Sequence, residues 1–154
     1  MKIRLLWVGR GKDKWSQSAV EHYISRLPRH LGFEDKRISP VEFTGDVEVV
    51  RRKEAEHILG QLKDGDKLVA LDERGEGLHS EAFAKLIDSA AKQGTKRLVF
   101  AIGGPYGHGK RVREQAWKTV RLSDMVLNHA IARVVLTEQV YRASTILWGG
   151  SYHQ

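Results

Sequence analysis

Cysteine is absent from the 154 residues of this chain. The protein therefore contains no disulfide bond, no thiolate nucleophile and no thiolate metal site. No apolar run reaches the roughly 18 residues that cross a bilayer, and the apolar part of the N-terminus is too short, and too soon followed by charge, to predict a signal peptide. We therefore expect a cytoplasmic protein with no membrane partner.

Metal-ligand patterns are also missing. None of the seven histidines lies in a short ligand motif, and His22, His30, His57 and His79 stand among surface-like residues. We expect these four to be solvated and predict no metal site. No serine lies in a G-x-S-x-G elbow, so no hydrolase nucleophile is visible.

Basic residues are abundant. The 26 lysines and arginines exceed the 19 aspartates and glutamates, which gives a net charge of +7. This balance favours a polyanionic partner, which in a cytoplasmic protein is usually nucleic acid. Because the basic residues form short groups and no basic tail, a folded surface must carry any such binding.

Strand-like and helix-like segments alternate along the chain. The apolar patterns predict strands at 2–8, 37–43, 67–72, 96–104 and 118–123, and helices at 13–28, 45–65, 79–94 and 129–149. Asp46, Ser80 and Asn128 are the predicted N-caps, and Pro40 suggests that the second strand lies at a sheet edge. The alternation indicates an α/β fold in which helices cover both faces of a mostly parallel sheet, within a single domain of residues 1–154.

Ligands of such sheets bind beyond the carboxyl ends of the strands, so the loops after Leu71, Ile102 and Leu122 are the candidate site. The second of these loops has four glycines in the seven positions 103–109. Read literally, 104–110 fits the phosphate-binding pattern G-x-x-x-x-G-K, which makes a nucleotide-binding protein one alternative. Against it, Arg111 stands where a hydroxyl should meet the metal, and Pro105 removes a backbone donor.

Three C-terminal features each allow two interpretations. The helix at 129–149 is apolar over more than one face, so it is either fully buried or shared between the core and a subunit interface. Arg133 and Arg142 are either a solvated edge or a basic stripe of an RNA site. Tyr152 and His153 are either a disordered end or a tail that folds over a nucleoside. A non-enzymatic ribosome-binding module would explain the charge equally well.

Four motifs carry a specific resemblance: "ALD" at 70–72, "IGGPYG" at 102–107, "LSDMVLNHAIARVVLTEQVYRA" at 122–143 and "YH" at 152–153. In this order and over the whole length, the chain resembles the ribosomal large-subunit methyltransferase H (RlmH) family of the SPOUT class. The resemblance implies a C-terminal trefoil knot and a homodimer. It also implies S-adenosylmethionine-dependent methylation of N3 of a pseudouridine in 23S ribosomal RNA, with the large subunit or whole ribosome as partner and no DNA.

The resemblance also implies site residues. The cofactor should lie against Leu71, Gly103, Leu122, Ser123, Asp124, Met125, Val126 and Leu127. Gly103 and Gly104 should bring bare backbone close to the cofactor and to a neighbouring strand of the knot. Arg142, Tyr152 and His153 match the catalytic, RNA-facing side. The base that removes the N3 proton stays open between His153, Glu138 and His129. The chain departs from the family pattern at 108–112 and 128–133.

Overall fold

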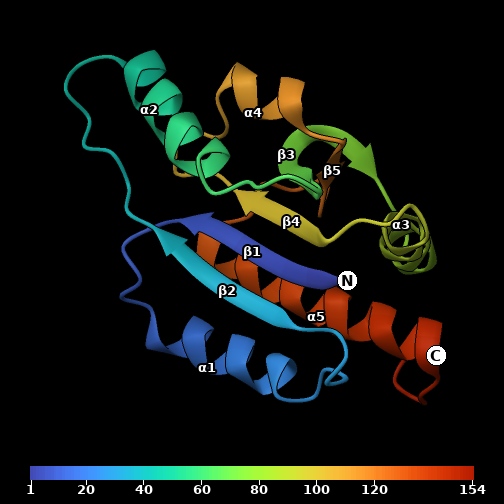
Figure 1. The fold of residues 1–154 in the computed structure, drawn as a ribbon. Helices are drawn as coiled ribbons and strands as arrows, with labels where there is room; N and C mark the ends of the chain where they lie inside the picture. Colours follow the sequence, from blue (N-terminus) through green and yellow to red (C-terminus); the bar gives the residue numbers. More distant parts are fainter.

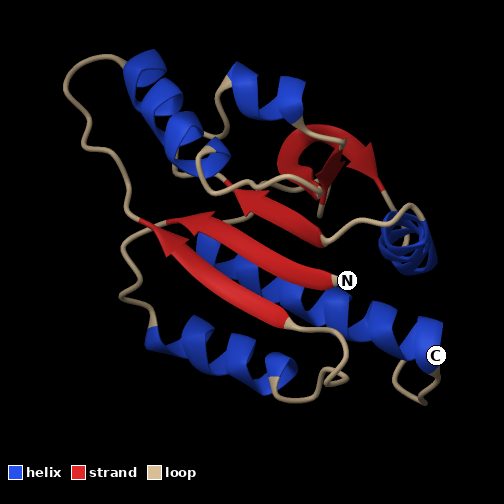
Figure 2. Ribbon diagram, viewed as in Figure 1, coloured by secondary structure: helices blue, strands red, loops and turns tan.

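Strands and helices alternate strictly along the chain, which the computed structural model describes from Met1 to Gln154 (Figures 1 and 2). In chain order the elements are β1 (Lys2–Val8), α1 (Lys14–Ile24), β2 (Phe33–Ile38), α2 (Val47–Leu59), β3 (Asp66–Gly77), α3 (Ser80–Lys92), β4 (Arg97–Ile102), α4 (Lys110–Gln115), β5 (Lys118–Arg121) and α5 (His129–Trp148).

All five strands form one sheet in the order β2-β1-β4-β3-β5, and every neighbouring pair is parallel. The predicted parallel sheet is therefore confirmed. At one end of the sheet, β3 therefore lies between β4 and β5. Because the strands are parallel, their carboxyl ends meet at one edge of the molecule, where the predicted ligand loops begin.

Alternate side chains of β1 enter two separate cores. Ile3, Leu5 and Trp7 belong to the larger core, which α3 and α5 cover, whereas Leu6 and Val8 belong to a smaller core that α2 and α4 cover. Figure 1 shows α2 and α4 together on one face, with α1 and α5 on the other. Helices therefore cover both faces, as the sequence predicts.

The second strand begins earlier than predicted. We expected residues 37–43, whereas β2 covers Phe33–Ile38, with the sequence FEDKRI. Its polar composition hides it from a search for apolar runs, but an edge strand with exposed side chains tolerates charge. β2 is an edge strand, as predicted, although Pro40 lies beyond its end.

Two helices also differ from their patterns. The second was expected to reach Gly65, but α2 ends at Leu59, with Gly60 as its C-cap. The six-residue α4 was not predicted, because it is short and buries only Val112. Helix boundaries of this kind depend on tertiary packing more than on local preference.

Two of the three predicted N-caps are confirmed. Asp46 and Asn128 each accept a hydrogen bond from the backbone amide two residues further on, at 2.9 Å and 2.8 Å. The prediction for Ser80 is wrong. His79 occupies the cap position of α3, and the Ser80 hydroxyl instead donates to Gln139 of α5 at 2.8 Å, which ties the two helices together.

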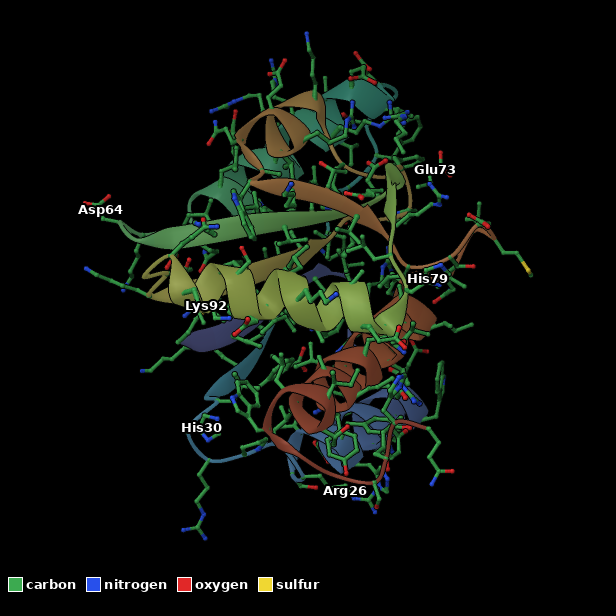
Figure 3. All side chains as sticks on the ribbon, turned by 90° about the vertical axis from the view of Figure 1, so that its right-hand side faces the viewer. Arg26, His30, Asp64, Glu73, His79 and Lys92 are labelled. Carbon is green, nitrogen blue, oxygen red and sulfur yellow. The ribbon has the colours of Figure 1, made fainter.

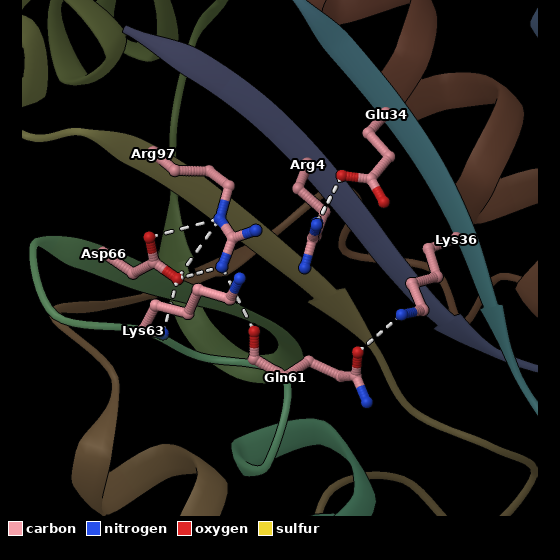
Figure 4. A network of polar contacts seen from close by, with 7 residues as sticks. All are labelled: Arg4, Glu34, Lys36, Gln61, Lys63, Asp66 and Arg97. Atoms are coloured by element: carbon pink, nitrogen blue, oxygen red, sulfur yellow. Dashed lines mark hydrogen bonds and ion pairs between the residues drawn. The ribbon is translucent and has the colours of Figure 1, made fainter.

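A polar network closes the amino-terminal end of the sheet (Figure 4). Arg97 at the start of β4 pairs with Asp66 at the start of β3, and their side chains are 12% and 4% exposed. Arg97 also donates to the carbonyl of Gln61 at 3.1 Å. On the neighbouring strands, Arg4 pairs with Glu34 at 2.5 Å. These ion pairs fix the strand starts at the end opposite the ligand loops.

No helix combines the length and the apolar character that a membrane span requires. The trefoil knot implied by the resemblance stays a prediction, because strand order and pairing do not define how the chain passes through its loops.

Candidate functional site

A cleft of about 710 Å³ lies at the carboxyl ends of β4 and β5, beside the middle of β3. Leu71 of β3 pairs with Ile102 of β4 and with Val120 of β5. β4 and β5 end near this level, whereas β3 has a register shift between Leu71 and Glu76 and continues to Gly77. Figure 3 shows Glu73, which lies in the irregular part of β3 after Leu71, on the opposite side of the molecule from Asp64, which precedes the strand. The segment after Leu71, which the sequence predicts to be a loop, is therefore an irregular part of β3, and it meets the loops after β4 and β5 at the cleft.

Seven of the eight predicted cofactor residues line this cleft: Leu71, Gly103, Leu122, Ser123, Met125, Val126 and Leu127. The eighth, Asp124, does not line it. Its side chain is 87% exposed and accepts a hydrogen bond from Arg121 at 2.8 Å. Asp124 therefore fixes the turn from outside the cleft.

The glycines at the start of the β4–α4 loop permit close packing within the protein. A Cβ at Gly103 would lie 3.0 Å from the backbone carbon of Gly107, and a Cβ at Gly104 would lie 2.8 Å from the Glu54 carboxylate. The bare backbone therefore approaches its own loop and α2, where we had expected a neighbouring strand. Gly103 also lines the cleft. One side of its backbone therefore packs against its own loop, and the other side is accessible to a ligand.

Glu54 of α2 supports this loop from behind. It is 3% exposed and accepts a hydrogen bond from the Val41 amide at 3.2 Å. Burial raises the pKa of Glu54, while hydrogen bonds from the backbone of Val41 and Gly104 oppose the rise. We missed Glu54 in the sequence, yet it lies between Val50 and Ile58 in an i, i+4, i+8 row that indicates a buried helix face.

His108 is a second buried group that the sequence did not indicate. It lines the cleft but is only 4% exposed. Its Nε2 lies 2.9 Å from the carbonyl oxygen of Ala101, and its Nδ1 has no partner in the protein. Burial lowers the pKa of His108. No local pattern marks this residue, because its burial depends on how the loop folds back over β4.

Asn128 and His129 begin α5 at the cleft wall. The Asn128 side chain accepts a hydrogen bond from the amide of Ala130, so it caps the first turn of the helix. His129 packs against the turn after β1, where a Cβ at Gly9 would lie 3.2 Å from its Cδ2. Of the three candidate bases, His129 is the one that lines the cleft.

Arg142, Tyr152 and His153 form a compact cluster away from the cleft. Arg142 pairs with Glu138 at 2.6 Å, Tyr152 donates to the same carboxylate at 3.0 Å, and the Arg142 guanidinium lies 4.7 Å from the Tyr152 ring centroid. His153 Nε2 is 3.1 Å from Glu81. The tail is therefore folded against α5 and α3. We call these five residues the tail cluster.

The contacts of the tail cluster shift the pKa values of Tyr152 and Arg142. Desolvation, followed by a hydrogen bond with Tyr23 and the hydrogen bond that Tyr152 donates to Glu138, raises the pKa of Tyr152. The hydrogen bond to Glu138 raises the pKa of Arg142. Arg142 follows His129 by 13 residues on α5, so along the helix axis it is roughly 20 Å away. One chain therefore does not bring the cluster to its own cleft.

An open hollow of about 840 Å³ adjoins the tail and the chain after α1. Arg26, His30 and Trp148 line it, and Figure 3 labels the first two at this end of the molecule. The hollow is larger than the cleft but lacks its convergence of strand ends. We therefore take the cleft as the candidate site.

Arg133 does not belong to a basic stripe. It is 2% exposed, pairs with Asp35 of β2, donates to Gln17 at 2.5 Å, and lies 4.3 Å from the centroid of the Trp7 ring. Its role is to tie α5 to β2 and α1. Of the two arginines considered for an RNA surface, only Arg142 is left.

The fully buried interpretation of α5 is wrong. Ile131 in its first turn is 44% exposed, and the adjoining loop exposes Met125 and Val126 at 73% and 84%. Met125 and Val126 line the cleft, and Ile131 lies in the helix that follows them. We call these three exposed apolar side chains the apolar rim. Surfaces of this kind on a folded protein mark interaction sites.

The phosphate-loop alternative finds no support in the cleft. Lys110 does not line it, its side chain is 81% exposed, and its ammonium lies 3.4 Å from Glu114 on the same helix. A lysine that holds phosphates would point into the cradle formed by the glycine loop.

The sequence is similar to known proteins over almost its whole length. Residues 1–153 match the family described as "Predicted SPOUT methyltransferase". A protein of Trichlorobacter lovleyi named ribosomal RNA large subunit methyltransferase H is 42% identical over 153 residues, 99% of each chain. Proteins with the same name are 39% identical over 153 residues in a Geobacter species and 41% identical over 155 residues in Porphyromonas gingivalis, again over 99% of each chain.

Proposed function

This chain belongs to the SPOUT methyltransferase family, and from that premise we propose that it methylates N3 of a pseudouridine in 23S ribosomal RNA. The methyl donor of the family is S-adenosylmethionine. The observation that carries the proposal is the convergence of the loops after β4 and β5 and the irregular part of β3 on one cleft, at the positions that the family motifs occupy. A ribosomal substrate implies that the protein acts in the cytoplasm.

The cleft suits the cofactor in size and in chemistry. Its volume of about 710 Å³ lies within the usual range for sites of small molecules. Leu71, Leu122 and Leu127 supply apolar walls, and Gly103 offers bare backbone. The unpartnered, buried Nδ1 of His108 offers one acceptor. These residues would hold the adenosine and methionine parts of the donor.

The bound donor supplies a methyl group on a positively charged sulfur, from which a nitrogen nucleophile takes it by direct displacement. The protein mainly has to orient the two reactants, and orientation can supply about 7–11 kcal/mol in favourable cases. The rigid loops held by Glu54 and by the Asn128 cap serve this purpose. Without cysteine, a covalent adduct to a pyrimidine carbon is excluded.

The N3 proton has to leave before or during transfer. His129 can accept it from within the same chain, since it lines the cleft. Glu138 and His153 lie in the tail cluster, where Glu138 accepts hydrogen bonds from Arg142 and Tyr152. These two can take part only if a tail cluster reaches the cleft from elsewhere.

We propose that a second copy of the chain supplies that tail cluster in a homodimer. The apolar rim beside the cleft provides a surface for subunit contact, and the most common soluble oligomers are symmetric dimers. In such an arrangement Arg142, Tyr152 and His153 of one subunit face the RNA base over the cofactor of the other. Arg51, Arg74 and Arg121 line the same cleft and would contact the RNA phosphates.

The proposal is tested by titration calorimetry with S-adenosylhomocysteine, followed by methyl transfer from radiolabelled S-adenosylmethionine to large subunits, whole ribosomes and free 23S RNA. We expect binding of the product and transfer to ribosomal particles. Binding of ATP with magnesium in its place would support the phosphate-loop alternative. Binding of neither, with RNA binding retained, would support a ribosome-binding module.

A matched pair of variants tests the position of the cofactor. Gly103→Val should abolish binding of S-adenosylhomocysteine, because the side chain fills the cleft wall and displaces the loop. Gly32→Ala is the control, since its Cβ would lie 3.4 Å from the flexible Lys2 side chain, an ordinary contact remote from the cleft. Unchanged affinity in Gly103→Val would contradict the assignment.

A further inference from the structure

The protonation pattern of His108 follows from its one hydrogen bond. Nε2 lies 2.9 Å from the carbonyl oxygen of Ala101, and a carbonyl oxygen can only accept. Nε2 therefore carries the hydrogen, and in the neutral ring Nδ1 is left as an acceptor. Burial lowers the pKa of His108, which keeps the ring neutral at pH 7.

The surroundings of Nδ1 place this acceptor at the cleft wall. A Cβ added to Gly103 would lie 3.2 Å from it, so Nδ1 adjoins the bare backbone of a cleft residue. The nitrogen is buried and no protein atom donates to it. Buried polar atoms nearly always have a partner, so one without a protein donor calls for an explanation.

The neighbouring charged groups are already engaged. Arg113 of α4 donates to the backbone carbonyl of His108 at 2.8 Å, and its guanidinium lies 3.6 Å from the Asp72 carboxylate. Asp72 also accepts from the Arg74 amide at 2.9 Å. These contacts hold the His108 backbone, while the ring lies close to the Leu71 backbone and to Gly103, and both of these residues line the cleft.

We propose that Nδ1 of His108 accepts a hydrogen bond from a neutral N–H or O–H donor on the adenosine part of the cofactor. The inference rests on the proposed function, since it assumes that the donor molecule occupies this cleft. A neutral acceptor beside apolar walls matches the adenine amino group or a ribose hydroxyl. The charged ammonium of the methionine part would select a carboxylate instead.

Three substitutions distinguish the loss of the Nδ1 acceptor from the loss of the hydrogen bond between Nε2 and the Ala101 carbonyl. His108→Gln retains a donor that can reach Ala101 but has no acceptor at the Nδ1 position, whereas His108→Asn retains an amide near that position. His108→Leu removes both. We expect the Kd of S-adenosylhomocysteine to rise about five- to tenfold in His108→Gln and His108→Leu and less in His108→Asn. Thermal unfolding of each variant identifies any loss of folding.

Modified ligands identify the donor. S-inosylhomocysteine lacks the amino group, and the 2′-deoxy and 3′-deoxy forms of S-adenosylhomocysteine each lack one hydroxyl. The analogue that lacks the relevant donor should bind wild type several-fold more weakly, and this difference should disappear in His108→Gln. If every analogue loses the same affinity in wild type and variant, the inference is wrong.

A spectroscopic measurement on the wild-type protein covers the case in which the variants do not fold. The ¹⁵N resonance of His108 Nδ1 should shift on addition of S-adenosylhomocysteine and stay close to its free position with the analogue that lacks the donor. Ligand binding without any shift would overturn the inference alone. Absence of any cofactor binding to wild type would overturn the proposed function instead.

Discussion

Buried polar side chains determine the shape of the loops around the cleft. Glu54 holds the amides of Val41 and Gly104, and Arg133 joins α5 to Asp35. Each is a charged residue in a sequence neighbourhood rich in charge, which favours a surface interpretation. Their burial follows from packing between distant segments, so the sequence could predict the loops but not the groups that hold them.

Replacing Glu54 should destabilise the protein and loosen the glycine loop. Glu54→Ala leaves two backbone amides without an acceptor in a buried place, so we expect the free energy of unfolding to fall by about 2 kcal/mol. Glu56→Ala, on the exposed side of α2, is the control and should change stability by less than about 0.5 kcal/mol. Urea unfolding measures both, and equal effects would contradict the role of Glu54.

His108 should make stability depend on pH. Its pKa is lowered from the ordinary value of 6.5 in the folded chain, so below pH 6.5 the unfolded state binds more protons and the free energy of unfolding falls. His108→Gln does not titrate there. The free energy of unfolding of wild type minus that of this variant should therefore decrease as the pH falls from 7.5 to 5.5. Urea unfolding at each pH measures this difference. A constant difference would show that His108 is not protected from protonation.

At the scale of elements, regular apolar patterns were sufficient for most of the sheet. β1 (Lys2–Val8) has the bounds that its apolar run predicts, and α5 (His129–Trp148) begins at its predicted cap. β2 (Phe33–Ile38) and α4 (Lys110–Gln115) have one buried side chain each among polar residues. Elements with so little apolar periodicity take their bounds from their neighbours, which a local pattern cannot supply.

The Asp66–Arg97 pair should stabilise the sheet without affecting the cleft. Asp66→Ala leaves a buried guanidinium without its partner, which costs about 3 kcal/mol. Because the pair lies at the amino-terminal ends of β3 and β4 (Figure 4), the affinity for S-adenosylhomocysteine should be unchanged at temperatures where the variant is folded. Asp64→Ala, at an exposed position just before β3, is the control. A weaker affinity in Asp66→Ala alone would show that the two ends of the sheet are coupled.

At the scale of the whole molecule, the proposed functional groups lie in two places. The cleft takes its residues mainly from the middle of β3 and from the loops after β4 and β5, whereas the tail cluster lies near the other end of α5. The resemblance of the motifs selected both sets of residues from the sequence. It did not reveal their separation, because the distance depends on how far α5 extends before the tail turns back.

Mixed dimers test whether two subunits share each site. Gly103→Val leaves the tail cluster intact, and Arg142→Ala leaves the cleft intact, so each variant alone should be inactive in methyl transfer. When the two are unfolded and refolded together in equal amounts, half of the dimers contain one chain of each kind. Such a dimer has one complete site, and the mixture should recover about a quarter of wild-type activity, as expected for a symmetric dimer. Each variant refolded alone is the control.

A mixture that stays inactive, although native mass spectrometry finds mixed dimers, would mean that each chain uses its own tail. In that case the tail would have to leave Glu138 and Glu81 and cross the length of α5 before methyl transfer.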